Sequence, residues 1–349
     1  MSQLSPVSNF PIPVRVARPL LFQPIFWLGI LVWIVLSGIA AILIVQTGGL
    51  PFDHHLPALE GKPPLAQLLN LQINAAFGLL VMGLGWLLTR NRNVPDIATR
   101  APALQQTRQE LLLLIGYGIF AQLFGWFLGP ALGIHAISLH LTGTLFGTYD
   151  TVPPTEVWLW VTFNFVTYAL LPYLYFRSRG YSNENLSLHS NNPRADTIVI
   201  IGVMVLEAAG ELSAYNSVFG LNPNQLLIGV PLSFLVNFFG TVLPIMVYLV
   251  GLIFPRLLRL TGSFTVTTLL GGLAYALLHI FDSWAIYTSP TASALSAIFV
   301  LLQYTVPGMI KVVLSVRTAN AWVHALGYHA VAPHVTVDTP LIVKIFGIR

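Results

Sequence analysis

Long runs of apolar residues recur from residue 25 to near the end of the chain, and short segments between them hold most of the charged residues. A helix needs about 20 apolar residues to cross a hydrocarbon core about 30 Å thick. Several runs reach this length, so the pattern predicts an all-α, polytopic transmembrane bundle of about eight spans. The expected spans are 25–46, 67–89, 110–133, 156–176, 197–215, 226–254, 264–287 and 292–316.

The segment 319–347 is also apolar but less regular. Pro333 lacks a backbone N–H and disfavours continuation of a helix, so we expect the helix entered at Ala319 to end at or before Pro333. The segment is then either a broken ninth span or a re-entrant hairpin. Its histidines His324, His329 and His334 are spaced by five, which on an α-helix turns each about 140° from the last and spreads them around the axis.

Composition supports a membrane protein. Of 349 residues, 55% are hydrophobic and 8% are charged, and the mean hydropathy is +0.76. A soluble domain carries about a quarter charged residues, so the expected partner is the lipid bilayer. The net charge of +4 resides in short loops between spans, which argues against a nucleic-acid partner. The absence of cysteine excludes disulfides, thiolate chemistry and Cys-ligated metals.

Basic residues are distributed unevenly between the two sets of loops. When the spans alternate, thirteen of the sixteen Lys and Arg residues fall on one side and the opposite loops hold Lys62. Basic loops stay in the cytoplasm, so we expect the amino terminus and the loops near 95 and 190 to be cytoplasmic, and the loops near 54 and 150 to be extracytoplasmic. The thirteen are Arg15, Arg18, Arg90, Arg92, Arg100, Arg108, Arg177, Arg179, Arg194, Arg256, Arg259, Lys311 and Arg317.

Two acidic residues, Glu207 and Glu211, lie inside the fifth expected span. They are four residues apart and so share one helix face. An ionisable group at the bilayer centre costs about 2.5–3.5 kcal/mol even on lenient insertion scales, so each one calls for an explanation. The functional interpretation is a paired-carboxylate site for proton transfer, general base catalysis or cation binding. The structural alternative is an acid hydrogen-bonded to a neighbouring helix.

The seventh expected span carries Tyr275, His279 and Asp282 at i, i+4 and i+7, which is one stripe of an α-helix. A carboxylate that accepts an imidazole N–H fixes the tautomer of the ring and raises the basicity of its other nitrogen. A polar stripe that only joins helices is the alternative. Among the later histidines we select His329 as a site candidate, whereas His135 and His140 are interpreted as packing or interfacial residues.

From residue 173 onward, four stretches resemble the CPBP family of intramembrane proteases (CAAX prenyl endopeptidase and bacteriocin-processing, or Abi, proteins) in their order and spacing. They are the basic loop 176–188, the stretch 251–262, TyrAlaLeuLeuHis at 275–279, and ValArgThrAlaAsnAlaTrp leading to His329. The resemblance implies a helical core at 173–349, preceded by transmembrane spans at 25–172 and a cytoplasmic segment at 1–24.

The same resemblance implies an intramembrane peptidase, in which an acid and histidines activate water on a membrane-embedded protein or peptide. The family's glutamate motif is missing, because Ile245, Met246 and Val250 stand at its positions, and in the third motif His334 and Asp338 fit the spacing better than His329. A replacement acid would come from Glu207 or Glu211, working with His279, Asp282 and His329. A non-catalytic scaffold and a proton-coupled transporter remain alternatives; the sequence assigns no metal, cofactor or substrate.

Overall fold

The computed structural model describes residues 20–52, 62–143 and 152–349, and within these ranges the chain forms helices and no strands. Several helices are continuous runs that pass through π-helical turns, labelled η. In chain order the main elements are α1 (Pro24–Thr47), α2 (Pro64–Thr89), α3 (Leu104–Ala131), α4–η4–α5 (Pro154–Ser178), α6 (Pro193–Ala214), α7–η6–α8–η7–α9 (Pro223–Thr261), α10 (Phe264–Leu277), α11 (Pro290–Thr318), α12–η8 (Ala321–His329), η9 (Ala332–Val337) and α13 (Thr339–Ile345).

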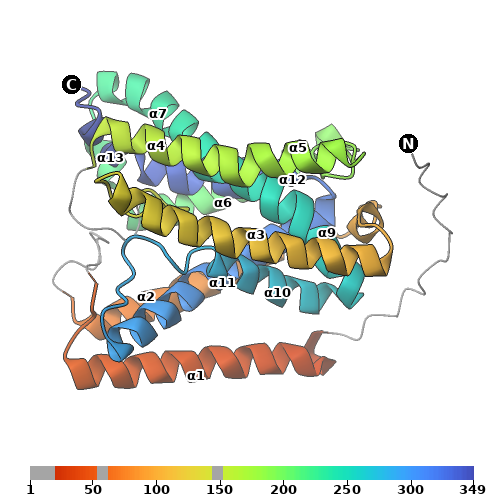
Figure 1. Cartoon of the computed structure of the whole chain (residues 1–349), viewed down its shortest axis with the longest axis horizontal. Helices are drawn as coiled ribbons and strands as arrows, with labels where there is room; N and C mark the ends of the chain where they lie inside the picture. Colours follow the sequence, from red (N-terminus) through yellow and green to blue (C-terminus); the bar gives the residue numbers. More distant parts are fainter. Residues whose placement is uncertain (1–19, 53–61, 144–151) are drawn as a thin grey trace.

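The described part of the chain has seven helices long and apolar enough to cross a membrane, and α10 is a shorter apolar helix of 14 residues. Most helices run along the same long axis, with α1 at one edge and α4–α5 at the opposite edge (Figure 1). Many large apolar side chains of the outer helices, such as Leu31, Ile73 and Phe120, are exposed, as expected where lipid replaces water. The predicted all-α polytopic bundle is confirmed, and the chain is an integral, multi-pass membrane protein.

One predicted span differs from the observed structure. The apolar run expected to be helical over 264–287 is helical only to Leu277, so His279 and Asp282 do not lie on an α-helical stripe. Beyond Leu277 the chain makes successive i→i+3 turns, with the N–H of His279 bonded to Ala276 and that of Asp282 bonded to His279. Residues three apart are eclipsed in such turns, and this places His279 beside Asp282.

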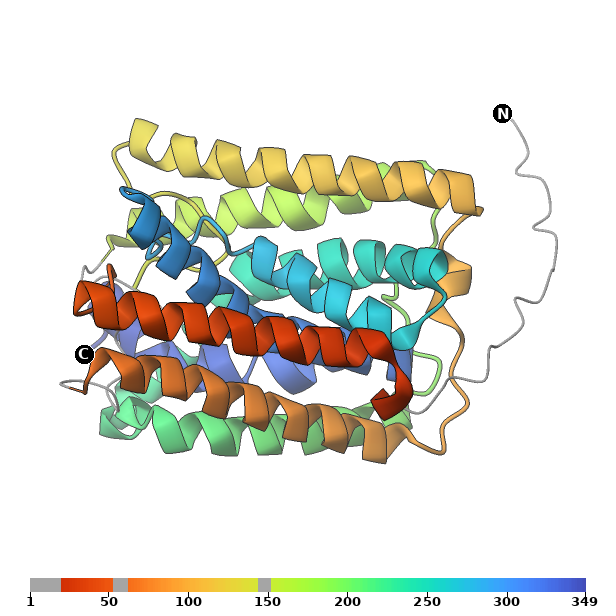
Figure 2. The same cartoon turned by 90° about the horizontal axis from the view of Figure 1, so that it is seen from below.

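The loops near 95 and 190 lie at the same end of the bundle as the end of α11. Arg100 donates hydrogen bonds to Ser187 Oγ (2.8 Å) and to the carbonyl of Ala319 (2.9 Å). Arg92 pairs with Asp196 at 2.6 Å. The carboxyl terminus lies at the opposite end of the bundle, on the left in Figure 2. The structure therefore groups the basic loops that the alternation of spans predicts.

Lys311 is an exception to that grouping. It lies within α11 and is 1% exposed, so it is not a loop residue and does not belong with the basic residues grouped at that end. The predicted loops near 54 and 150 fall largely in 53–61 and 144–151, and most of the amino-terminal segment falls in 1–19; these residues lie outside the described ranges.

The charge distribution leads to a prediction on membrane topology. On this cysteine-free background, Asn93→Cys and Asn191→Cys should be labelled by a membrane-impermeant thiol reagent from the cytoplasmic side only, and Ser217→Cys from the other side only, because basic loops stay in the cytoplasm. All three positions are exposed. Labelling of Asn93→Cys and Ser217→Cys from the same side would contradict the predicted orientation.

The carboxyl-terminal segment is a broken helix that consists largely of π-helical turns. The first helical run ends at His329, before Pro333, and Pro333 lies in the first turn of η9, where its missing N–H costs nothing. The N–H of Ala330 bonds to Ala325 and that of Thr336 to Val331, which is the i→i+5 pattern of a π-helix. Residues five apart therefore lie nearly in line here, unlike in an α-helix.

A close approach between helices holds this segment against α6. A Cβ atom built at Gly327 would lie 3.1 Å from the Cα and 3.3 Å from the carbonyl oxygen of Ile200. A side chain at this position would be tighter than ordinary van der Waals contact, so glycine favours this close approach of the two backbones. The π-helix η8 therefore lies directly beside the helix that carries Glu207 and Glu211.

Candidate functional site

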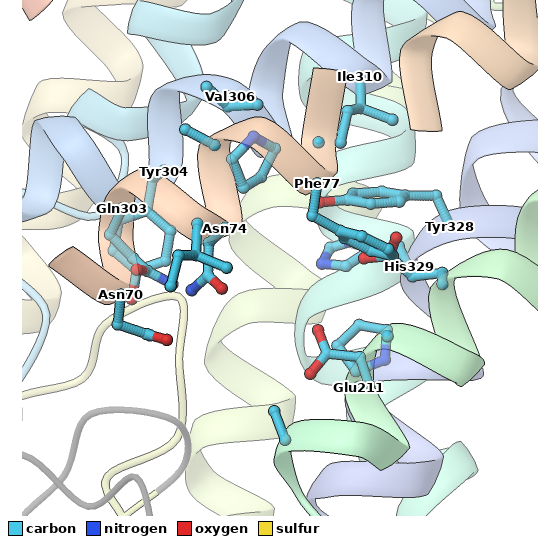
Figure 3. A pocket seen from close by; sticks show the side chains of 18 of the residues that line it. Asn70, Asn74, Phe77, Glu211, Gln303, Tyr304, Val306, Ile310, Tyr328 and His329 are labelled. Atoms are coloured by element: carbon cyan, nitrogen blue, oxygen red, sulfur yellow. The ribbon is translucent and has the colours of Figure 1, made fainter. Parts of the chain in front are cut away.

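A chamber of about 240 Å³, lined by both apolar and polar side chains, lies between α2, α6, α11 and the broken carboxyl-terminal helix. Its polar wall residues are Asn70, Asn74, His140, Glu207, Glu211, Ser213, Tyr215, Tyr275, Gln303, Tyr304, Lys311, Tyr328, His329 and His334. Figure 3 shows Glu211, Tyr328 and His329 on one side of the pocket and Asn70, Asn74, Gln303 and Tyr304 on the other. Polar groups of this kind inside a membrane bundle are costly unless they are paired or functional.

Histidine rings form a continuous buried row along one side of this chamber. Ring centroids are 5.3 Å apart for His324 and His329, 5.0 Å for His329 and His334, and 6.2 Å for His334 and His140. The π-helical turns produce the row, since they bring residues spaced by five much closer to one face than an α-helix does. The expectation that these histidines spread around the axis is wrong, because it assumed α-helical geometry.

Two of these histidines have carboxylate partners. His334 Nδ1 lies 2.7 Å from Asp338 Oδ2, one helical turn later. Both side chains are buried, with His334 1% and Asp338 2% exposed. The hydrogen bond to the carboxylate fixes the orientation of the imidazole ring, so the other ring nitrogen, Nε2, points away from Asp338. His334 Nε2 has no hydrogen-bond partner among the described residues. It is therefore a nitrogen available to a substrate or a water molecule in the chamber.

A second histidine–carboxylate group lies at the end of the row. His279 Nδ1 and His140 Nδ1 are each 3.2 Å from Asp282 Oδ2, and the Tyr304 hydroxyl is 2.9 Å from the same oxygen. The His279 ring is stacked on His140 at 4.5 Å and on Tyr304 at 4.0 Å. All four side chains are buried. This group, which we call the Asp282 cluster, adjoins the chamber through His140 and Tyr304.

The chamber also contains a buried lysine. Lys311 Nζ lies 4.1 Å from the ring centroid of Tyr275 and 4.5 Å from that of Tyr328, between the two aromatic rings. Aromatic faces attract cations, most strongly where water is excluded. Glu207 interacts electrostatically with Lys311 and with Glu211. The chamber thus brings an amine and carboxyl groups close together among membrane-length helices.

The structure brings the predicted site residues into one region, but not all into direct contact. Glu207, Glu211 and His329 line the chamber, whereas His279 and Asp282 lie behind its wall. Tyr275 lies between the two parts, 4.6 Å from the His279 ring and 6.3 Å from the His329 ring. Asp338, the acid whose spacing fits the family's third motif, pairs with His334.

Sequence reasoning missed two members of the site. His140, interpreted as a packing residue, lies in the non-helical stretch after α3 and contacts both Asp282 and His279. No periodicity identifies a loop residue, so the sequence carries no signal for it. Lys311 was assigned to a span end, although an apolar helix continues past it on both sides. His135, by contrast, pairs with Glu156 at 2.8 Å, outside the row.

Comparisons with known proteins add no further assignment: no family model, no curated protein and no solved structure matches this chain.

Proposed function

We propose that this protein is an intramembrane hydrolase that cleaves a membrane-embedded peptide, as the resemblance to the CPBP proteases suggests. The observation that carries the proposal is the buried pair of His334 and Asp338, which leaves His334 Nε2 free in a chamber that also holds Glu207 and Glu211. An oriented histidine next to carboxylates is an arrangement suited to general acid–base catalysis.

The chamber residues divide into three roles in this proposal. Glu211, or its neighbour Glu207, takes a proton from the attacking water, and His334 gives a proton to the leaving amine. Lys311 stabilises the negative charge that develops on the carbonyl oxygen in the tetrahedral intermediate, since a cation in a water-poor site acts strongly on such charge. Asp338 does not react; it fixes the tautomer of His334.

The family resemblance supports the same residues by a different route. His334 and Asp338 are four apart, the spacing of the family's third motif, and Tyr275 and His279 match its second motif. Because the first motif is missing, the chain lacks the acidic residues that the family uses. Helix α6 carries two other acidic residues that could replace them in this proposal. The substrate class follows from the location of the chamber among apolar, membrane-length helices.

The test compares cells that express the wild-type protein with cells that express Glu211→Gln, a variant of the same shape that cannot act as a base. Mass spectrometry of labelled amino termini in the membrane fraction should reveal termini that appear with the wild type and disappear with Glu211→Gln. Equal accumulation of both proteins in the membrane is the control for folding. If no terminus depends on the wild-type protein, the peptidase proposal fails.

One observation favours a second candidate, a proton-coupled transporter. The row from His324 to His140 has successive ring separations of 5.3, 5.0 and 6.2 Å, short enough for proton transfer through an intervening water. A transporter would show proton flux in sealed liposomes that His329→Ala abolishes. Flux without wild-type-dependent termini would favour this candidate over the hydrolase.

A further inference from the structure

The Asp282 cluster gathers several atoms of metal-ligand type around one carboxylate, and His279 Nδ1 lies 3.3 Å from Asp282 Oδ1 as well as close to Oδ2. Three polar groups converge on a single carboxylate oxygen: His140 Nδ1 and His279 Nδ1 at 3.2 Å each, and the Tyr304 hydroxyl at 2.9 Å. The Tyr304 hydroxyl is also 3.1 Å from His140 Nδ1. All the side chains involved are buried, so they are shielded from bulk solvent.

The two His–Asp282 distances are long for hydrogen bonds to a carboxylate. Bonds between a charged N–H and a carboxylate oxygen are about 2.7–2.9 Å. The other two His–carboxylate pairs obey this range, with 2.7 Å for His334 and Asp338 and 2.8 Å for His135 and Glu156. The two His–Asp282 distances of 3.2 Å are longer than the distances in these two pairs.

That spacing fits atoms that share a metal ion. Nitrogen and oxygen ligands bind zinc at about 2.0–2.2 Å, and at tetrahedral corners such atoms are about 3.3 Å apart. One ligand atom each from His140, His279 and Asp282 can be chosen so that all three lie within 4.8 Å of one another. The spacings of 2.9–3.2 Å around Asp282 Oδ2 are close to this tetrahedral value.

We propose that His140, His279 and Asp282 bind a divalent transition metal ion, with the Tyr304 hydroxyl as its fourth neighbour. Two imidazoles and one carboxylate form a ligand set used by catalytic zinc and by non-haem Fe²⁺. The imidazole rings are stacked with centroids 4.5 Å apart and an interplanar angle of 20°, so binding requires one ring to rotate out of the stack until both Nδ1 lone pairs point at one ion. Because His140 and Tyr304 line the chamber, the ion lies at its wall.

Metal binding does not depend on the proposed hydrolase activity, because it is measured without a substrate. In the experiment, tag-free protein in detergent is incubated with Zn²⁺ or, without oxygen, with Fe²⁺. It is then desalted and its metal content is determined by mass spectrometry. The wild-type protein should retain about one ion of one of these metals per chain, and His140→Ala and Asp282→Asn should each lower the metal content more than about tenfold.

The matched control is His135→Ala, which removes a histidine from the same loop but leaves the Asp282 cluster intact; it should bind metal like the wild type. Asp282→Asn keeps the shape of the side chain, and size-exclusion chromatography shows whether each variant is folded. X-ray absorption of the loaded wild type should show imidazole ligands. Retention of neither metal by the wild type, or equal binding by folded Asp282→Asn, would overturn the proposal.

Discussion

The variant Arg256→Ala is expected to lose about 3–5 kcal/mol of folding stability, because breaking a buried ion pair leaves an uncompensated charge. Arg256 is 1% exposed and binds Glu110 Oε2 through Nε at 3.0 Å and Nη2 at 2.7 Å. Its guanidinium also lies 4.6 Å from the Phe176 ring centroid. Burial raises the pKa of the Tyr181 hydroxyl, which stays protonated and donates to Glu110 at 2.8 Å.

The measurement is unfolding in mixed micelles as a function of denaturing detergent. Arg179→Ala is the matched control, because Arg179 is an exposed arginine near the same end of the bundle, with its guanidinium 5.9 Å from the Tyr175 ring centroid. This replacement should change the free energy of unfolding by less than about 1 kcal/mol. The double variant Glu110→Leu with Arg256→Met should recover much of the loss, because no buried charge remains. A loss below about 1 kcal/mol for Arg256→Ala would contradict this account.

The variant His334→Gln is expected to lower the rate of peptide cleavage by about 10²–10⁴-fold, the usual contribution of a positioned acid or base. Gln keeps some of the bulk and polarity of His334 but cannot transfer a proton. Asp338→Asn should have a smaller effect in the same direction, because an amide can donate as well as accept a hydrogen bond and no longer fixes the His334 tautomer. Both rates are measured with the purified protein in liposomes.

His189→Gln is the control for this series, since His189 is an exposed loop histidine and its replacement should leave the rate unchanged. The thermal stability of His334→Gln separates a chemical role from a structural one. If its melting temperature falls sharply and the residual folded protein cleaves at the wild-type rate, His334 is structural.

Most of the fold can be predicted from the sequence, because a helix that crosses a membrane requires a long run of apolar residues. The starts of α1, α6 and α11 lie within a few residues of the expected positions. The exception is α10, where apolar residues continue past Leu277 although the helix ends there. Hydropathy measures the environment of a segment and not its hydrogen-bond pattern, so it cannot distinguish a helix from a buried series of turns.

The candidate site is less predictable because it depends on unusual backbone geometry and on long-range contacts. The spacing of five between His324, His329 and His334 matches the i→i+5 hydrogen bonds of π-helical turns, and an α-helical wheel does not show that these residues lie near one face. His140 meets Asp282 across 142 positions of the chain, a contact that no local pattern encodes. The sequence did indicate Glu207 and Glu211 as site residues, because an acidic residue inside a transmembrane span is energetically costly and usually has a function.

The most direct test of the proposed hydrolysis is peptide cleavage in ¹⁸O-labelled water by the purified protein in liposomes, with peptides that contain the cleavage sites found in cells. Attack by water predicts that each new carboxyl terminus carries ¹⁸O from the solvent, and that Glu211→Gln and His334→Gln produce almost none of this product. Product formed at equal rates by the wild type and both variants would contradict the central claim, as would no cleavage by the well-folded wild-type protein.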